Sequence, residues 1–237
     1  MVRRQRLILF LAFTFGCHKA PVPASTGEPQ VRATVVTIRE TLQPSNKTYT
    51  HALMIANNVA RSGDEVDAWR LFDLKREQVT FVDEIAKTYR TAALKDLTKE
   101  HREAYAQPPA PELPVAQWSW ISSQQGGHAH ISMGGYKREL SFSDKTPIPP
   151  QLFAFMRASE PAPSPIAGVA RVIDEALLNV RGFPMTDHAE LPFDDKKLVV
   201  DRVVEKIEQK NVPASWFQVP RGFKDVTTPA ANRRPAS

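Results

Sequence analysis

Residues 69–89 read WRLFDLKREQVTFVDEIAKTY, and this stretch decides the fold class. It overlaps three short runs in which apolar and polar residues alternate, at residues 66–74, 78–83 and 88–92. Alternation with a period of two is typical of β-strands, and polar residues between such runs are typical of tight turns. The stretch therefore predicts three consecutive antiparallel strands that are joined as hairpins.

The same alternating pattern continues on both sides of this stretch. Turns are expected at Gln43-Pro44-Ser45-Asn46, at Gln125-Gly126-Gly127 and at Asp194-Asp195-Lys196, because these residue types favour turn conformations. Further strands are expected at Val31–Thr41, Thr48–Ala60, Val115–Ser122, His130–Ser143, Pro184–Leu191 and Lys197–Gln209. Since the last of these runs is apolar on both sides, we expect both faces of the sheet to be partly covered.

Three segments have helical spacing instead. Leu94–Gln107 is followed by a proline-rich stop, Pro150–Ala158 is short, and Pro165–Val180 has Ser164 as a candidate N-cap and Gly182 just beyond its end. Helices therefore interrupt sets of strands rather than alternating with single strands. This order favours an antiparallel α+β architecture over a parallel βαβ one.

The first sixteen residues have the composition of an export signal. Three arginines precede the apolar run Leu7–Phe15, which is too short to cross a bilayer because a spanning helix needs roughly 20 apolar residues. The run ends at Gly16-Cys17, which resembles a bacterial lipobox, and we expect cleavage before Cys17 and attachment of lipid to it. Ordinary cleavage, leaving Cys17 without lipid, stays open because Thr14 and Phe15 depart from the usual lipobox. Cys17 is the only cysteine, so the domain has no internal disulfide.

Beyond the signal sequence, the chain is expected to consist of a tether, one folded domain and a tail. Residues 17–30 are rich in Pro and Ala and predict a flexible tether, residues 31–226 form the folded domain, and residues 227–237 are expected to be disordered. His18 rather than an aspartate follows the cysteine, which by resemblance to enterobacterial lipoprotein sorting implies an outer-membrane location. The expected location is therefore the periplasmic face of a bacterial envelope, with the anchor in the outer membrane.

The charge of the chain does not indicate a nucleic-acid partner. The formal net charge is +5, and removing residues 1–16 takes away three arginines, which leaves about +2. No cluster of Lys and Arg with interleaved aromatic residues is present, so nucleic-acid binding is not expected.

No motif for covalent catalysis or for a cofactor is present. The sequence lacks Gly-x-Ser-x-Gly, Gly-x-x-x-x-Gly-Lys and Gly-x-Gly-x-x-Gly. His128 and His130 lie two residues apart and could begin a metal site, but no third ligand is apparent, and a solvated turn explains them more simply. Asp194 and Asp195 are better explained as a hairpin turn. No enzyme activity, metal or cofactor is therefore expected, although an unrecognised periplasmic enzyme stays open.

Aromatic side chains are the better candidates for a functional site. Trp118 and Trp120 lie two apart on an expected strand and so share one face, where they could line an apolar cleft. The competing explanation for each aromatic residue is ordinary core packing. The candidates for lining a ligand cavity are Trp69, Phe72, Phe81, Trp118, Trp120, Phe142, Phe153 and Phe155.

Two stretches carry a resemblance to a known group of proteins. Residues 69–89 resemble the hairpin of the LolA/LppX-like periplasmic lipoprotein families, in particular the uncharacterised branch that is similar to outer-membrane lipoprotein-sorting proteins. Residues 212–223, VPASWFQVPRGF, are similar to the closing segment of those families, with Phe223 where tyrosine is commoner. The resemblance implies a strongly curved antiparallel half β-barrel wrapped around one or two helices, with a concave apolar surface that holds acyl chains in some relatives.

These observations together predict an envelope lipoprotein that binds or shields an apolar ligand without covalent chemistry. The expected partners are a membrane, through acylated Cys17, and a lipid or the acyl chain of another lipoprotein. A structural or partner-binding module with a core filled by its own side chains is the alternative, and the sequence does not identify a protein partner.

Overall fold

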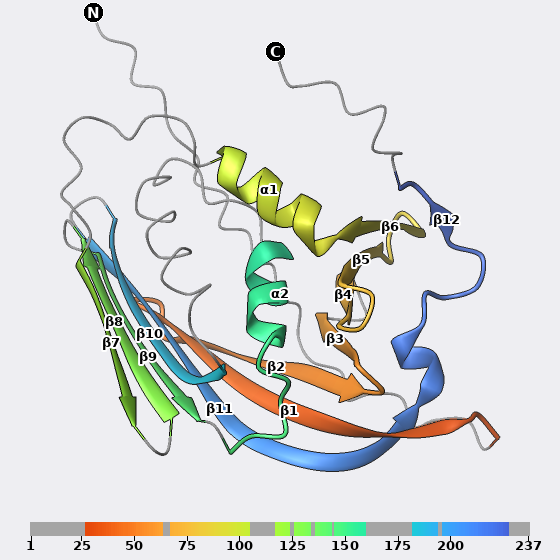
Figure 1. The fold of residues 1–237 in the computed structure, drawn as a ribbon, viewed down its shortest axis with the longest axis horizontal. Helices are drawn as coiled ribbons and strands as arrows, with labels where there is room; N and C mark the ends of the chain where they lie inside the picture. Colours follow the sequence, from red (N-terminus) through yellow and green to blue (C-terminus); the bar gives the residue numbers. More distant parts are fainter. Residues whose placement is uncertain are drawn as a thin grey trace, which may run out of the picture.

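A computed structural model describes residues 27–63, 67–104, 117–123, 126–133, 136–143, 145–159, 182–193 and 196–227. Most of these residues belong to a single sheet of twelve strands, in the order β12-β6-β5-β4-β3-β2-β1-β11-β10-β9-β8-β7 (Figure 1). All neighbouring strands are antiparallel except β12 and β6, which are parallel, so the sheet is mixed. Its end strands, β12 and β7, do not pair with each other within the described residues, so the sheet is open.

The first six strands form the predicted meander, since each one pairs with the next along the chain. The run predicted at residues 48–60 is two strands rather than one. Asn57 and Asn58 both have positive φ angles, of 48° and 64°, and form the two-residue turn between them. Asparagine tolerates this left-handed conformation, which a tight hairpin requires. The bounds are β1 Gln30–Gln43, β2 Lys47–Ala56, β3 Val59–Gly63, β4 Ala68–Asp73, β5 Gln78–Asp83 and β6 Thr88–Ala93.

The remaining strands extend the sheet on the other side of β1. The longest, β11, pairs with β1 along all 14 residues of β1 and joins the two halves of the sheet. The run predicted at residues 130–143 is again two strands, since one strand ends at Met133 and the next begins at Tyr136. The first of them already begins at Gly126, where a turn was expected. The bounds are β7 Gln117–Ser123, β8 Gly126–Met133, β9 Tyr136–Ser143, β10 Phe183–Phe193, β11 Lys196–Pro213 and β12 Lys224–Asp225.

Two α-helices are described, α1 at Leu94–Ala104 and α2 at Leu152–Ser159, with a 3₁₀ turn at Ala214–Phe217. Figure 1 shows both α-helices on the same side of the bent sheet. Neither of them is long and apolar enough to cross a membrane. The expected helix Pro165–Val180, the expected turn at Asp194-Asp195, and Cys17 with its signal sequence all lie outside the described residues.

The expected fold class, an α+β half β-barrel wrapped around one or two helices, is wrong. The chain is mostly one large, open, mixed sheet that carries two short helices of 11 and 8 residues. The alternating runs correctly indicate antiparallel neighbours, but they contain no information on how many strands join one sheet. The parallel pairing of β12 also depends on the return of the chain's end to β6, which no local pattern predicts.

Apolar residues are buried on both faces of the sheet, as expected. On the face that carries the helices, side chains from both halves of the sheet and from α2 form the main core, which includes Phe72, Leu140 and Leu152. On the opposite face, the C-terminal segment, residues 212–227, covers two smaller clusters. The backbone N–H of Val226 donates to the carbonyl of Tyr89 at 2.8 Å, which holds this segment against β6.

Candidate ligand pocket

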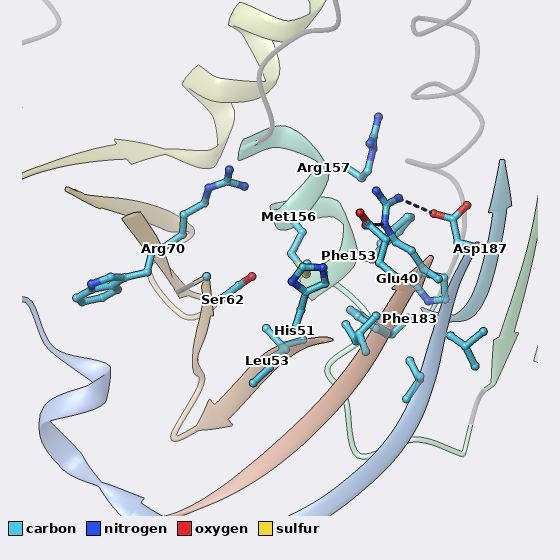
Figure 2. Close-up of a pocket in the computed structure, with 18 of the residues that line it drawn as sticks. Glu40, His51, Leu53, Ser62, Arg70, Phe153, Met156, Arg157, Phe183 and Asp187 are labelled. Carbon is cyan, nitrogen blue, oxygen red and sulfur yellow. Dashed lines mark hydrogen bonds and ion pairs between the residues drawn. The ribbon is translucent and has the colours of Figure 1, made fainter. Parts of the chain in front are cut away.

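A pocket of about 460 Å³ lies between α2 and the sheet (Figure 2). Its walls come from β1, β2, β3, β4, β5, β9, β10, β11 and α2. Helix α2 contacts both β4 and β10, which are separated by four strands in the sheet. The bend of the sheet therefore brings residues from its two halves to one site, and α2 forms a wall between them.

Most of the pocket lining is apolar, and both the sheet and α2 contribute apolar side chains. The apolar side chains that the strands contribute, such as Ile38, Leu53 and Phe183, face the helices, because side chains two residues apart project from the same face. Phe153 also makes edge-to-face contacts with Phe142 and Phe183, at centroid distances of 6.2 and 6.4 Å, which order this wall. The apolar lining includes Ile38, Leu53, Phe81, Phe153, Met156, Phe183 and Val204.

One wall of the pocket is an ion chain, which we define as Glu40, Arg202, Asp187 and Arg138. Three of its members are buried, and the Arg202 side chain is 38% exposed. Arg138 donates two hydrogen bonds to the Asp187 carboxylate, at 2.8 and 2.7 Å. Arg202 donates to Asp187 at 3.1 Å and to Glu40 at 2.6 Å. These residues come from four neighbouring strands, so the ion chain crosses β1, β11, β10 and β9 in sequence.

The ion chain is electrostatically balanced. Burial by itself raises the pKa of Asp187, but the guanidinium groups of Arg138 and Arg202 outweigh it and lower this pKa to about 2. The carboxylate is therefore ionised at neutral pH. Two guanidinium groups and two carboxylates cancel, which explains how the ion chain is accommodated with Glu40, Arg138 and Asp187 each less than 10% exposed.

Two further arginines line the pocket, Arg70 from β4 and Arg157 from α2. The Nη1 atom of Arg70 donates a hydrogen bond to the Ser159 hydroxyl at 3.2 Å. Its guanidinium carbon lies 5.9 Å from the centroid of the Phe81 ring, within the range of a cation–π contact. The hydrogen bond of Arg70 therefore connects β4 to the last residue of α2.

The expected cavity residues divide into three groups. Phe81 and Phe153 line the pocket, whereas Phe72, Phe142 and Phe155 are buried in the main core. Trp118 and Trp120 belong to β7, where they pair with Ile131 and Ala129 of β8, and their side chains are outside the described part of the structure.

Trp69 is also among the residues that line the pocket, but its side chain belongs to a different cluster. It packs with Leu71 and Val82 on the face that the C-terminal segment covers. Its Nε1 donates to Glu84 at 2.8 Å, and the guanidinium carbon of Arg61 lies 4.0 Å from its ring centroid. Trp69 is therefore a core residue of the opposite face, because it alternates with Arg70 along β4.

Sequence reasoning missed the charged residues of the pocket. Glu40 and Arg138 are buried at positions of β1 and β9 whose neighbours along the strand are more exposed, so they point towards the core. A charged residue at an inward position of an alternating run was the available signal, since charges are rarely buried unless they are paired. The partners could not be predicted, because they lie on neighbouring strands far away in the sequence.

His128, His130 and His188 lie outside the pocket, whereas His51 of β2 is part of its lining. His128 and His130 are exposed on β8, and the Nδ1 atom of His130 lies 3.5 Å from a Glu139 oxygen. A hydrogen bond of 2.5 Å between Nδ1 of His188 and Asp201 raises the pKa of this histidine. Within the described residues, no three His, Cys, Asp or Glu side chains are placed to hold a metal ion.

No protein-family model matches this chain, and no curated protein matches its sequence. In the comparison with solved structures 34 chains match, among them PNGF-II in a C2 space group, with a TM-score of 0.42 and 9% sequence identity. This match covers 84% of the present chain and 31% of PNGF-II, so the chain spans about a third of that protein's length. A likeness at this level identifies neither a family nor an activity. None of these comparisons bears on the resemblance to the LolA/LppX-like families, which stays a prediction.

Proposed function

We propose that this protein binds the apolar chain of a lipid or lipid-like molecule in the pocket between α2 and the sheet, without covalent chemistry. The observation that supports this function is the pocket itself, which has a volume of about 460 Å³ and apolar side chains on the sheet and on α2. Small-molecule sites usually have volumes of about 300–1,000 Å³ and an apolar lining with a few fixed polar groups. The ion chain supplies such polar groups on one wall.

The binding free energy would come mainly from removing the apolar chain from water. Each buried methylene contributes about 0.8 kcal/mol. The liquid volume of a water molecule is about 30 Å³, so the pocket has space for roughly 15 groups of that size. This space is therefore of the order that one acyl chain requires, at about one water-sized volume for each carbon.

Replacing Met156 with tryptophan tests this function. Met156 is partly buried on α2 and lines the pocket, so an indole at this position is expected to occupy the space of several methylenes. We expect the full-length variant, purified by affinity and extracted with organic solvent, to carry about tenfold less lipid per chain than the wild type, by mass spectrometry.

The matched control is Ile85→Trp, which adds the same ring in a turn where Ile85 is 77% exposed. It should carry as much lipid as the wild type, and thermal unfolding of both variants checks that they are folded. Equal lipid in the Met156→Trp variant and the control would contradict the proposal. A wild-type chain that carries no lipid would also overturn it, in favour of a partner-binding module with a self-filled core.

We propose further that the protein acts in a bacterial envelope, where Cys17 carries the lipid that anchors it to the outer membrane. The support is the sequence of the first 17 residues, in which a basic start and an apolar run precede the single cysteine. An anchored domain of this kind would meet lipids or lipoprotein acyl chains at the periplasmic face of the membrane.

Replacing Cys17 with alanine is expected to move the protein from the membrane fraction to the soluble fraction, because no acyl chain could then be attached. Fractionation of cells that express the full chain measures this change, and incorporation of labelled palmitate should disappear in parallel. Membrane association that persists unchanged in the variant would rule out anchoring through Cys17.

A further inference from the structure

A second cavity, of about 450 Å³, adjoins the ligand pocket. It is lined by Ser143 at the end of β9, by residues 145–147 of the loop that follows, and by β10 and β11. Met185 of β10 lines both spaces, so one flexible side chain lies at the boundary between them. The second cavity is therefore next to the pocket, within reach of a chain that is bound there.

A β-bulge in β10 places Met185 at this boundary. Met185 is the extra residue between Pro184, which pairs with Phe142 of β9, and Thr186, which pairs with Ser141. A bulge breaks the strict alternation of a strand and can redirect a side chain. The irregular register therefore explains how Met185 contacts both spaces.

Apolar residues of β11 continue from the pocket into the second cavity. Val204 lines the pocket and Ile207 lines the second cavity, and both side chains pack against the main core. Their cross-strand partners on β1 are Ile38 and Val36, which also pack in that core. The apolar surface that an extended chain needs is therefore continuous along the sheet from one space to the other.

The second cavity differs from the pocket in its polarity. Most of the residues that line it are polar or charged, namely Ser143, Lys145, Thr146, Glu208 and Gln209. It is also more open to solvent than the pocket. A polar group that is placed there keeps much of its hydration, whereas a polar group in an apolar pocket loses it. The second cavity therefore suits the polar end of a chain better than its apolar end.

We infer that the ligand is a single-chain amphiphile too long for the pocket alone, whose chain passes Met185 and whose polar end lies in the second cavity. This inference rests on the proposed function, because it requires that the apolar part of the chain occupies the pocket. At about one water-sized volume for each carbon, the pocket alone has space for roughly 15 carbons. The second cavity should therefore contribute to the binding of longer chains and not of shorter ones.

The test compares decanoate, which is short enough for the pocket alone, with oleate, which is too long for it. Both have a carboxylate head, so they differ mainly in the length of the chain. Each is used below the concentration at which it forms micelles, to displace the neutral fluorophore N-phenylnaphthylamine from the full-length protein. Because each buried methylene strengthens binding about fourfold, oleate should displace the fluorophore at concentrations at least about tenfold lower than decanoate.

Thr146→Trp then assigns this preference to the second cavity. Thr146 is partly buried in the loop between β9 and α2, and it belongs to the lining of the second cavity and not of the pocket. An indole there should weaken displacement by oleate about tenfold, which corresponds to about two buried methylenes, and leave decanoate within about twofold. Pro147→Trp, at an exposed position of the same cavity, is a second variant with the same expected result.

The matched control is Ile85→Trp, which adds the same ring at a site that is 77% exposed and should change neither ligand. Thermal unfolding checks that each variant is folded.

The outcomes separate this inference from the function on which it rests. Equal displacement by oleate and decanoate in the wild type would overturn the extension into the second cavity and leave apolar binding intact. The same conclusion would follow if both cavity variants left oleate unchanged, or weakened both ligands equally. Failure of the fluorophore to bind the wild type, or equal fluorophore binding by the Met156→Trp variant, would overturn the proposed function itself.

Discussion

Replacing Asp187 with asparagine is expected to lower the free energy of unfolding by about 3–5 kcal/mol. The carboxylate accepts hydrogen bonds from Arg138 at 2.8 and 2.7 Å and from Arg202 at 3.1 Å. Because the Arg138 side chain is only 9% exposed, the variant would leave its charge buried without the carboxylate that balances it. Urea denaturation at neutral pH, followed by circular dichroism, measures the change.

The pH dependence of stability provides a second signature of Asp187. Its pKa is lowered in the folded state from the ordinary value of 3.8 to about 2. A group whose folded pKa is lowered stabilises the protein above its unfolded pKa, and this contribution is lost as the pH falls through the folded value. The wild type should therefore lose the contribution of Asp187 between about pH 4 and pH 2, and the asparagine variant should lack this part of the dependence.

Asp201→Asn is the matched control for this experiment. Asp201 is on β11, next to Arg202 but on the other face, and its side chain is 38% exposed. Its hydrogen bond to His188 is therefore screened by solvent, and the variant should remain within about 1 kcal/mol of the wild type. A loss at Asp187 no larger than the loss at Asp201 would contradict the account of the ion chain as a balanced unit.

Replacing Phe72 with alanine is the second change for which we expect a large effect, a loss of about 3–5 kcal/mol in the free energy of unfolding. Phe72 is fully buried in the main core, opposite Ala60 of β3 and Val79 of β5. Removing its ring would leave a cavity that the surrounding strands can fill only in part, and its lining would lose van der Waals contacts. Chemical denaturation again measures the loss.

The control for Phe72 is Ile85→Ala, which removes a large apolar side chain from a site that is 77% exposed. Its effect should stay within about 0.5 kcal/mol, because surface substitutions away from special features change stability little. If Phe72→Ala cost no more than this control, the core between the helices and the strands β3, β4 and β5 would be packed differently from the structure.

Local sequence patterns determined most of the strands. The run predicted at Gln78–Asp83 coincides with β5, and the predicted runs at residues 31–41 and 88–92 lie within β1 and β6. These predictions succeed because alternation and turn residues act over a few neighbouring positions, where the backbone and side chains of one hairpin decide the outcome. Short turns within an alternating run were harder to predict. The Asn57-Asn58 turn, for example, divides the run predicted at residues 48–60 into two strands.

Only the tertiary structure decided the architecture and the site. The α+β half-barrel was wrong because the number of strands in one sheet, its open edges and the parallel pairing of β12 depend on contacts between distant segments. The roles of Trp69 and Glu40 show the same limit. Trp69 packs mainly with Leu71 and Val82 beneath the C-terminal segment. Glu40 is held at the pocket by its hydrogen bond from Arg202, which is 162 residues away in the sequence.

The sequence by itself therefore determined where most of the strands form and which residues of each strand share a face. The tertiary structure decided which face meets α2, which charges compensate one another, and which aromatic rings reach the pocket. The physical reason is that alternation is a property of a single strand, whereas ion pairing and cavity shape arise from the register between strands and from the bend of the whole sheet.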